Sequence, residues 1–387
     1  MTTLAPTTSG IVDAHVQYWN PRRNPWTRNP VARGYRYVPK IGDRLFSVAV
    51  PQSEREYILT PHIVGRAYEP QHYCADIAAV AEATGVPIES VVVSEAYWRL
   101  GDTQDPEAGR HAVDEVRYLQ GLAHGAGSEP SLGAMMVRAD PRSDGFVERL
   151  DAQLAISDRI RGIQVNATRH PDPKVRSAGP ADGMLASPSF LAGIEKIADR
   201  GLALEVFAYS HQLYDVITLA REFPDTTVII DHFGCPVGAF GPVGLRTGTT
   251  AAARADIIRL WRERMVSIAA ERNVVVKLSG LAMPVLGYGR EPWGNIGAQE
   301  TLTQMIGPLV RHVVAHFGAS RVMFGSNFPI DKPNATIDTI IGSLLEILEP
   351  WGEAVSRNIF RDTARRVYDI TEPEPEPTPD PEPEPET

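Results

Sequence analysis

The sequence predicts an α/β fold, a (β/α)8 TIM barrel, and three observations support it. Short β-branched runs alternate with helix-length amphipathic segments, as expected of parallel strands joined by crossover helices. Eight such runs occur, the number of strands in a closed barrel of this type. Most runs begin apolar and end polar, and barrel enzymes build their sites at the carboxyl ends of the strands.

The eight runs follow one another along the chain. The first four are GIVDAHV at 10–16, SVVVSEA at 90–96, LGAMMVR at 132–138 and RGIQVNA at 161–167. The last four are LALEVFA at 202–208, TVIIDHF at 227–233, VVVKLSG at 274–280 and RVMFGSN at 321–327. Two of the helices expected between them cover 188–201, where apolar residues recur at spacings of three and four, and 212–225, which ends against a proline.

An open, doubly wound sheet uses the same alternation of strands and helices. The polar strand ends favour the barrel, because they come from many strands and would meet at one mouth. Neither GxGxxG nor GxxxxGK[ST] follows a strand, which argues against a nucleotide site. Two long connections, at 18–70 and 280–295, are expected to fold over that mouth.

Composition predicts one large domain between two disordered ends. We expect a disordered segment at 1–9, a barrel domain at 10–370 and a disordered tail at 371–387. The tail alternates proline with acid and holds no apolar residue, so it cannot form a core. It carries seven of the acids behind the net charge of −10, which leaves −3 for the rest. No basic stripe indicates nucleic-acid binding.

The apolar runs and the cysteine count predict the localisation and exclude some cysteine chemistry. No basic leader with an apolar run and no stretch of about 18 apolar residues occurs, so we expect a cytoplasmic protein without a membrane partner. Two cysteines, Cys74 and Cys235, exclude a disulfide framework and a Cys-based zinc cluster.

Polar residues at the strand ends are the candidates for chemistry. In the first run, alternation would place Asp13, His15 and Gln17 on one face. His15 and His232 are the candidates for proton transfer, because an imidazole titrates near neutral pH. Asp13 and Asp231 could orient an imidazole or act as base. The other candidates are Glu95, Gln164, Asn166, Glu205, His211, Lys277 and Asn327.

Each of these has a chemical reason and a plainer alternative. Glu95 and Glu205 are competing bases, and Lys277 could neutralise a substrate carboxylate or a developing oxyanion. Gln164 and Asn166 could hydrogen-bond a substrate. His211 could serve the site from the fifth strand or cap the following helix. A lysine can equally reach water from a strand end, and a buried histidine can be a satisfied core donor.

Four motifs together resemble one known family. They are DAHxxxW at the first strand, FPDTTVIIDHFGCP through the sixth, VVVKLSGLAMP at the seventh and FGASRVMFGSNFPID at the eighth. In this order they resemble the amidohydrolase-related (amidohydrolase 2) group of the amidohydrolase superfamily, over residues 10–370. Within it they are most similar to the branch with sugar lactonases and 2-pyrone-4,6-dicarboxylate lactonase.

The resemblance implies a distorted TIM barrel with a His-x-His pair on strand one, histidines on strands five and six, and an acid on strand eight. Here Gln17 stands in place of the second histidine and Asn327 in place of the acid. Amides are weaker ligands than imidazoles and carboxylates. We therefore expect no cofactor and no tightly held Zn or Mn ion, with His15 and His232 as the strongest ligand candidates if one binds.

Three functions follow as hypotheses. The first is a hydrolase that opens a small lactone at the barrel mouth, in carbohydrate or aromatic-compound catabolism, with Asn327 orienting water. The second is a metal-dependent decarboxylase of an aromatic or unsaturated acid, which the resemblance also allows. The third is a barrel that binds a small molecule without turnover. The expected partner is a small, carboxylated substrate, and the resemblance allows a homo-oligomer.

Overall fold

The computed structural model describes residues 4, 8–23, 48, 51–57, 63, 65–94, 106–125, 130–288 and 298–371. Glu95 and the tail beyond residue 371 lie outside the described residues, as do parts of both long connections. The domain limits therefore remain a prediction. Near the start of the chain, Leu4 is buried and its backbone N–H donates to the carbonyl of Thr84 at 3.0 Å.

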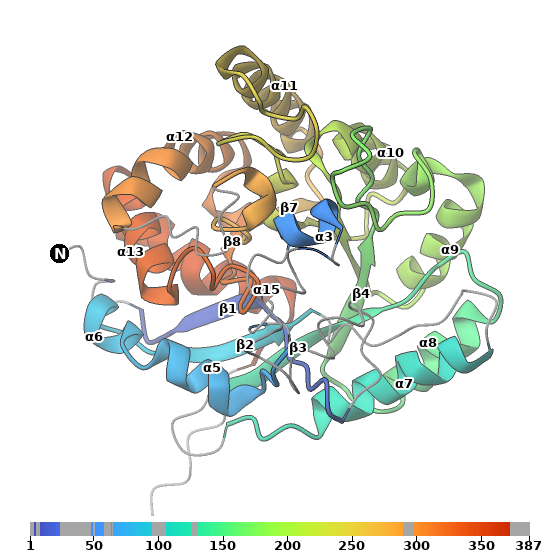
Figure 1. Cartoon of the computed structure of the whole chain (residues 1–387). Coiled ribbons are helices and arrows are strands. Elements are labelled where there is room, and N and C mark those ends of the chain that lie inside the picture. Colours follow the sequence, from blue (N-terminus) through green and yellow to red (C-terminus); the bar gives the residue numbers. More distant parts are fainter. Residues whose placement is uncertain are drawn as a thin grey trace, which may run out of the picture.

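Eight parallel strands form one sheet in chain order, which confirms the predicted fold class (Figure 1). Each predicted run overlaps one strand. The strands are β1 (Ile11–Val16), β2 (Ile88–Val93), β3 (Ser131–Arg138), β4 (Ile160–Asn166), β5 (Ala203–Phe207), β6 (Val228–Ile230), β7 (Val274–Leu278) and β8 (Val322–Phe324).

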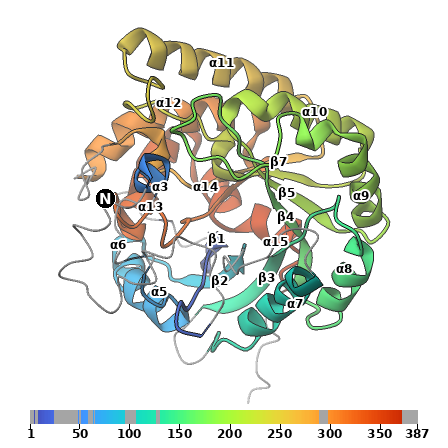
Figure 2. The ribbon, with the colours of Figure 1, turned by 45° about the vertical axis from the view of Figure 1, so that its right-hand side comes forward.

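Helices surround the strands, as both ribbon views show (Figure 2). The first six described are α3 (Gln52–Tyr57), α5 (Pro70–Ile77), α6 (Val80–Thr84), α7 (Pro106–Gln120), α8 (Phe146–Leu154) and α9 (Pro188–Ala198). The rest are α10 (Leu213–Glu222), α11 (Ala251–Ala269), α12 (Gln299–Phe317), α13 (Ile337–Leu348), α14 (Glu353–Arg357) and α15 (Thr363–Val367). None of the described helices combines the length and apolar character needed to cross a membrane.

The two helices predicted from spacing form where expected. Helix α9 begins at Pro188, whose fixed φ suits a first helical position and whose missing N–H costs nothing there. Helix α10 ends at Glu222, two residues before Pro224. A proline disfavours helical backbone in the residue before it, which explains this stop.

The barrel closes between β1 and the segment that follows β8. The Asn327 N–H donates to the His15 carbonyl at 2.9 Å, and the Gln17 N–H donates to the Phe328 carbonyl at 3.0 Å. Val16 and Phe328 form a parallel bridge at the same place. We call this junction the seam. It lies at the carboxyl end of β1, so the last pairing of the barrel sits beside the polar mouth.

The inside of the barrel is apolar below that mouth, at what we call the floor. Inward-facing side chains of the strands form a buried cluster there with Ala364 of α15 and with Tyr368. The strand residues of this cluster are Val12, Ala14, Val92, Ala134, Met136, Ala203, Ile229, Val275 and Met323. The C-terminal segment therefore closes the floor from inside.

Candidate active site

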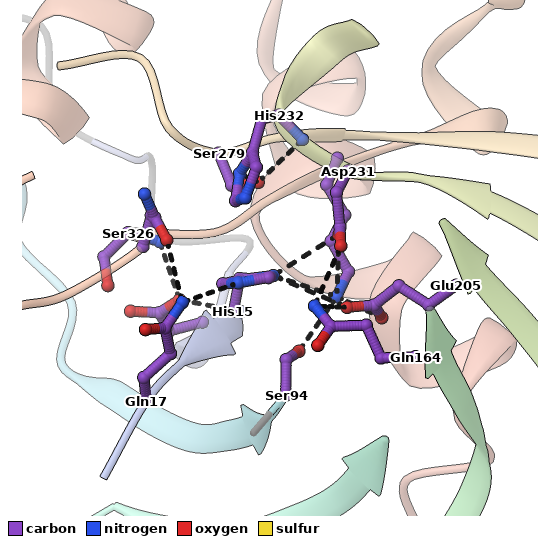
Figure 3. Close-up of polar contacts among 12 residues, drawn as sticks. His15, Gln17, Ser94, Gln164, Glu205, Asp231, His232, Ser279 and Ser326 are labelled. Atoms are coloured by element: carbon purple, nitrogen blue, oxygen red, sulfur yellow. Dashed lines mark hydrogen bonds and ion pairs between the residues drawn. The ribbon is translucent and has the colours of Figure 1, made fainter. Parts of the chain in front are cut away.

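A bulge in β1 sets which of its side chains face inward. Asp13 pairs with Val91 and Val16 with Val93, so β1 has one more residue than β2 over this stretch. An extra residue reverses the alternation of faces. His15 and Gln17 consequently point into the barrel, as Figure 3 shows.

The expectation that Asp13 shares this face is wrong. Its carboxylate accepts hydrogen bonds from the Tyr73 hydroxyl of α5 at 2.7 Å, from the Ser326 N–H at 2.8 Å and from the His15 N–H at 3.1 Å. Burial raises its pKa, and these hydrogen bonds oppose that rise. Asp13 thus braces β1 against α5 and the seam, and it does not point at the residues described next.

Three fully buried side chains, from β1, from β5 and from the residue that follows β6, converge at the mouth (Figure 3). His15 Nδ1 lies 3.4 Å from Asp231 Oδ1 and 3.6 Å from Glu205 Oε1. One nitrogen and two carboxylate oxygens, all within 4.8 Å of one another, form a group that could hold a metal ion. We call this group the acidic triad.

Lys277 brings a buried positive charge to the acidic triad. Its Nζ lies 2.5 Å from Glu205 Oε2, 3.4 Å from His15 Nδ1 and 3.7 Å from Asp231 Oδ1. It also donates to Ser94 Oγ at 3.3 Å and lies 5.5 Å from the centre of the Tyr368 ring. The predicted candidate from β7 therefore touches all three members of the triad.

Two neighbours orient the carboxylates. Gln164 Nε2 donates to Glu205 Oε1 at 3.2 Å and to Asp231 Oδ2 at 3.0 Å. The Tyr368 hydroxyl donates to Glu205 Oε2 at 3.3 Å from the floor. Asp231 Oδ1 is buried and has no hydrogen-bond partner among the described residues. A buried carboxylate oxygen in this condition indicates a place for a ligand.

A second set of polar contacts lies on the seam side of His15. Gln17 Nε2 lies 3.4 Å from His15 Nε2 and donates to Asn327 Oδ1 at 3.2 Å. Asn327 Nδ2 donates to Asp331 Oδ1 at 2.7 Å. Burial raises the pKa of Asp331 to about 8. Gln17 thus contacts the nitrogen of His15 that faces away from the triad.

His232 stands at the edge of the same mouth. Its ring centre is 4.8 Å from that of His15, and Ser279 Oγ lies 2.9 Å from its Nδ1. No described residue hydrogen-bonds its Nε2, which leaves that nitrogen for a ligand. The backbone at His232 and Asn327 has φ of 51° and 56°. Such positive φ values are strained in non-glycine residues and cluster at functional sites.

Both histidines are neutral at pH 7. Burial lowers the pKa of His15 to about 3, with a further lowering from the Lys277 charge and an opposing effect of Glu205. Burial likewise lowers the pKa of His232 to about 3, and His15 and Lys277 act in the same direction. In the triad, burial and Asp231 raise the pKa of Glu205, whereas Lys277 and His15 oppose this rise.

Some candidates lie apart from the triad. Asn166 Oδ1 accepts the N–H and hydroxyl of Thr168, so it shapes its own loop. His211 packs its ring against His170 at 5.2 Å, and its buried Nε2 has no hydrogen-bond partner among the described residues. Tyr368 and Asp331 contact site residues but were not predicted from the sequence. Asp331 could have been found as the acid of the eighth-strand motif, whereas no pattern marked Tyr368.

Known proteins similar to this chain agree with the family resemblance of the four motifs. The amidohydrolase family model matches residues 12–370. An L-fucono-1,5-lactonase of Burkholderia multivorans is 26% identical over 271 residues, which are 69% of this chain and 79% of the lactonase.

Solved structures share the fold at lower identity. An amidohydrolase from Burkholderia multivorans with bound zinc has a TM-score of 0.64 at 19% identity, over 94% of this chain and all of that one. A 5-carboxyvanillate decarboxylase from Sphingomonas paucimobilis has a TM-score of 0.51 at 15% identity, over the same shares. At these identities the likeness concerns the fold alone.

The expectation of a site without a metal is wrong. Glu205 and Asp231, predicted as base or substrate-binding candidates, join His15 in a group that could hold an ion. The barrel of similar fold from Burkholderia multivorans carries zinc. One imidazole and two carboxylates suit zinc or manganese, and the unpartnered Asp231 Oδ1 fits a ligand role. The prediction failed because it considered only the positions of Gln17 and Asn327.

Proposed function

Because this chain belongs to the amidohydrolase family, we propose that it is a hydrolase that opens the ring of a small lactone at the barrel mouth. The acidic triad, buried at the carboxyl ends of the strands, is the observation that carries the proposal. The relative named L-fucono-1,5-lactonase supports a cyclic ester of a sugar acid as the substrate class.

His15, Glu205 and Asp231 would hold a divalent ion. When bound, such an ion lowers the pKa of water and polarises a carbonyl group. Gln164 holds both carboxylates in place through its two hydrogen bonds. Gln17 contacts the far nitrogen of His15.

The chain's own residues handle water and proton. The Asp231 carboxylate, through the oxygen that does not hold the ion, would accept the proton of the attacking water. The water oxygen would bond to the carbonyl carbon, the ring C–O bond would break, and the protonated Asp231 would return its proton to the released oxygen to give a hydroxy acid. His232 is neutral, so its Nε2 can hydrogen-bond the substrate or the water, while Ser279 holds its Nδ1.

A lactone panel tests this proposal. Purified protein, loaded with zinc or manganese, is assayed for acid release from sugar-acid lactones and from 2-pyrone-4,6-dicarboxylate. We expect turnover of at least one lactone, and at least a roughly 100-fold loss in Asp231→Asn. The matched control is Asp256→Asn on the exposed face of α11, where an acid pairs with Arg259.

The outcomes separate the hypotheses. Unchanged activity in Asp231→Asn would refute the assigned site, and the absence of turnover with every lactone would refute the proposed reaction. A protein that binds panel compounds without converting them would point to a binding barrel.

Decarboxylation of an aromatic acid is the second candidate. The acidic triad favours it, because a metal-dependent decarboxylase needs a bound ion and the triad could hold one through two carboxylates that were not predicted as metal ligands. Release of carbon dioxide from carboxylated phenols, with no acid release from lactones, would establish it in place of hydrolysis.

A further inference from the structure

The charges around Lys277 do not balance once a divalent ion binds. Glu205 and Asp231 contribute two negative charges when ionised, and Lys277 contributes one positive charge, all with fully buried side chains. A divalent ion would balance the two carboxylates alone. With the Lys277 ammonium still present, the site would carry an excess positive charge, which is costly to bury.

Position adds to charge. Lys277 Nζ lies within 3.7 Å of an atom from each of His15, Glu205 and Asp231, which are the three residues that would hold the ion. An ion bound to them would therefore be a close neighbour of the ammonium group. Two cations at such a separation repel strongly where water is excluded.

We infer that the Lys277 ammonium competes with the divalent ion for the acidic triad. It stabilises the folded protein when no metal is bound, and it weakens metal binding. The inference rests on the proposed metal site. Without an ion, Lys277 neutralises one of two adjacent buried carboxylates. With an ion bound, the ion and the ammonium group share the same two carboxylates. A higher metal concentration is therefore needed to fill the site than if Lys277 were uncharged.

Two variants that remove the charge test the inference, Lys277→Met and Lys277→Gln. Zinc affinity is measured by competition with a chromophoric chelator, and the melting temperature is recorded with and without zinc. We expect both variants to bind zinc at least about tenfold more tightly than the unmodified protein. Their melting temperatures should be lower without zinc and should rise more when zinc is added.

Lys196→Met is the matched control, because its ammonium is partly exposed on α9 and pairs with Glu195 far from the triad. It should leave zinc affinity unchanged. Equal or weaker zinc binding in both Lys277 variants would overturn the inference while leaving the proposed site intact. The same holds if neither variant folds in saturating zinc, since the ion should then replace the lost charge.

The failure of the proposed site itself looks different. If the unmodified protein and both Lys277 variants bind no zinc or manganese, the metal site and this inference fall together. Glu205→Gln separates specific from adventitious binding, since it should abolish zinc binding in the Lys277→Met background as well.

Discussion

The two ends of the barrel interior differ sharply although the same strands build both. On β5, β6 and β7, the floor residues Ala203, Ile229 and Val275 stand two positions before Glu205, Asp231 and Lys277. The strand side chains of the floor are apolar and pack against Ala364 and Tyr368, whereas the mouth buries charges. Burying apolar surface stabilises the fold, and burying charges opposes it. Residues two positions apart along the chain therefore serve different ends: the first stabilises the fold and the second belongs to the site.

Substitution at the floor should have the largest effect on stability. Ile229 is fully buried in the floor, so Ile229→Ala leaves a cavity and should destabilise the protein by about 2–5 kcal/mol. Denaturant unfolding measures this loss. Activity and zinc affinity per folded molecule should stay within about twofold. A loss of about 2–5 kcal/mol in the free energy of zinc binding as well would show that floor and mouth are not independent.

Substitution at the mouth should do the opposite. Glu205→Gln removes one of two adjacent buried carboxylates and keeps the shape of the side chain. We expect lactone turnover to fall at least about 100-fold, or roughly 2.7 kcal/mol of transition-state stabilisation. The melting temperature of the metal-free protein should change little. A drop like that of Ile229→Ala would show that the mouth also holds the fold together.

Acid should destabilise the metal-free protein through the mouth. His15 and His232 have pKa values lowered to about 3 in the fold, so below pH 6.5 the unfolded chain binds more protons than the folded one. Stability is full above about pH 6.5 and falls as the pH drops towards 3, by on the order of 1–2 kcal/mol per histidine at pH 5. Chemical denaturation in chelator at pH 8, 6 and 5 measures this. His232→Gln should show a shallower decline.

Tyr368 joins the two regions, so its hydroxyl should have a small effect on both. Tyr368→Phe keeps the ring in the floor and removes the hydrogen bond to Glu205. A loss of no more than about 1.5 kcal/mol in stability is expected, with a few-fold fall in kcat. Calorimetry and steady-state kinetics test this. An unchanged kcat would confine Tyr368 to the floor.

Removal of the acidic tail should have the smallest effect. Deleting residues 372–387 takes away none of the mouth or floor residues, since Tyr368 is retained. Lactone turnover and melting temperature should stay within experimental error. A clear change in either would assign the tail a role in one of the two regions.

The fold could be predicted from the sequence more completely than the site. Eight runs of β-branched residues predicted eight strands because alternation with amphipathic segments is a property of local sequence. The inward turn of His15 depends on a bulge between Asp13 and Val16, which pairing with β2 creates and a lone strand does not reveal. Tyr368 reaches Glu205 across 163 positions, a contact that no local pattern marks.

The seam has a consequence for when the site can form during synthesis of the protein. Gln17 and Asn327, which meet there, are 310 positions apart, so the amino-terminal half of the site waits through most of translation for its counterpart. A nascent chain on the ribosome exposes His15 early yet has no competent pocket until the eighth strand emerges. Catalytic competence should accordingly appear late in synthesis, after the other seven strands have left the ribosome.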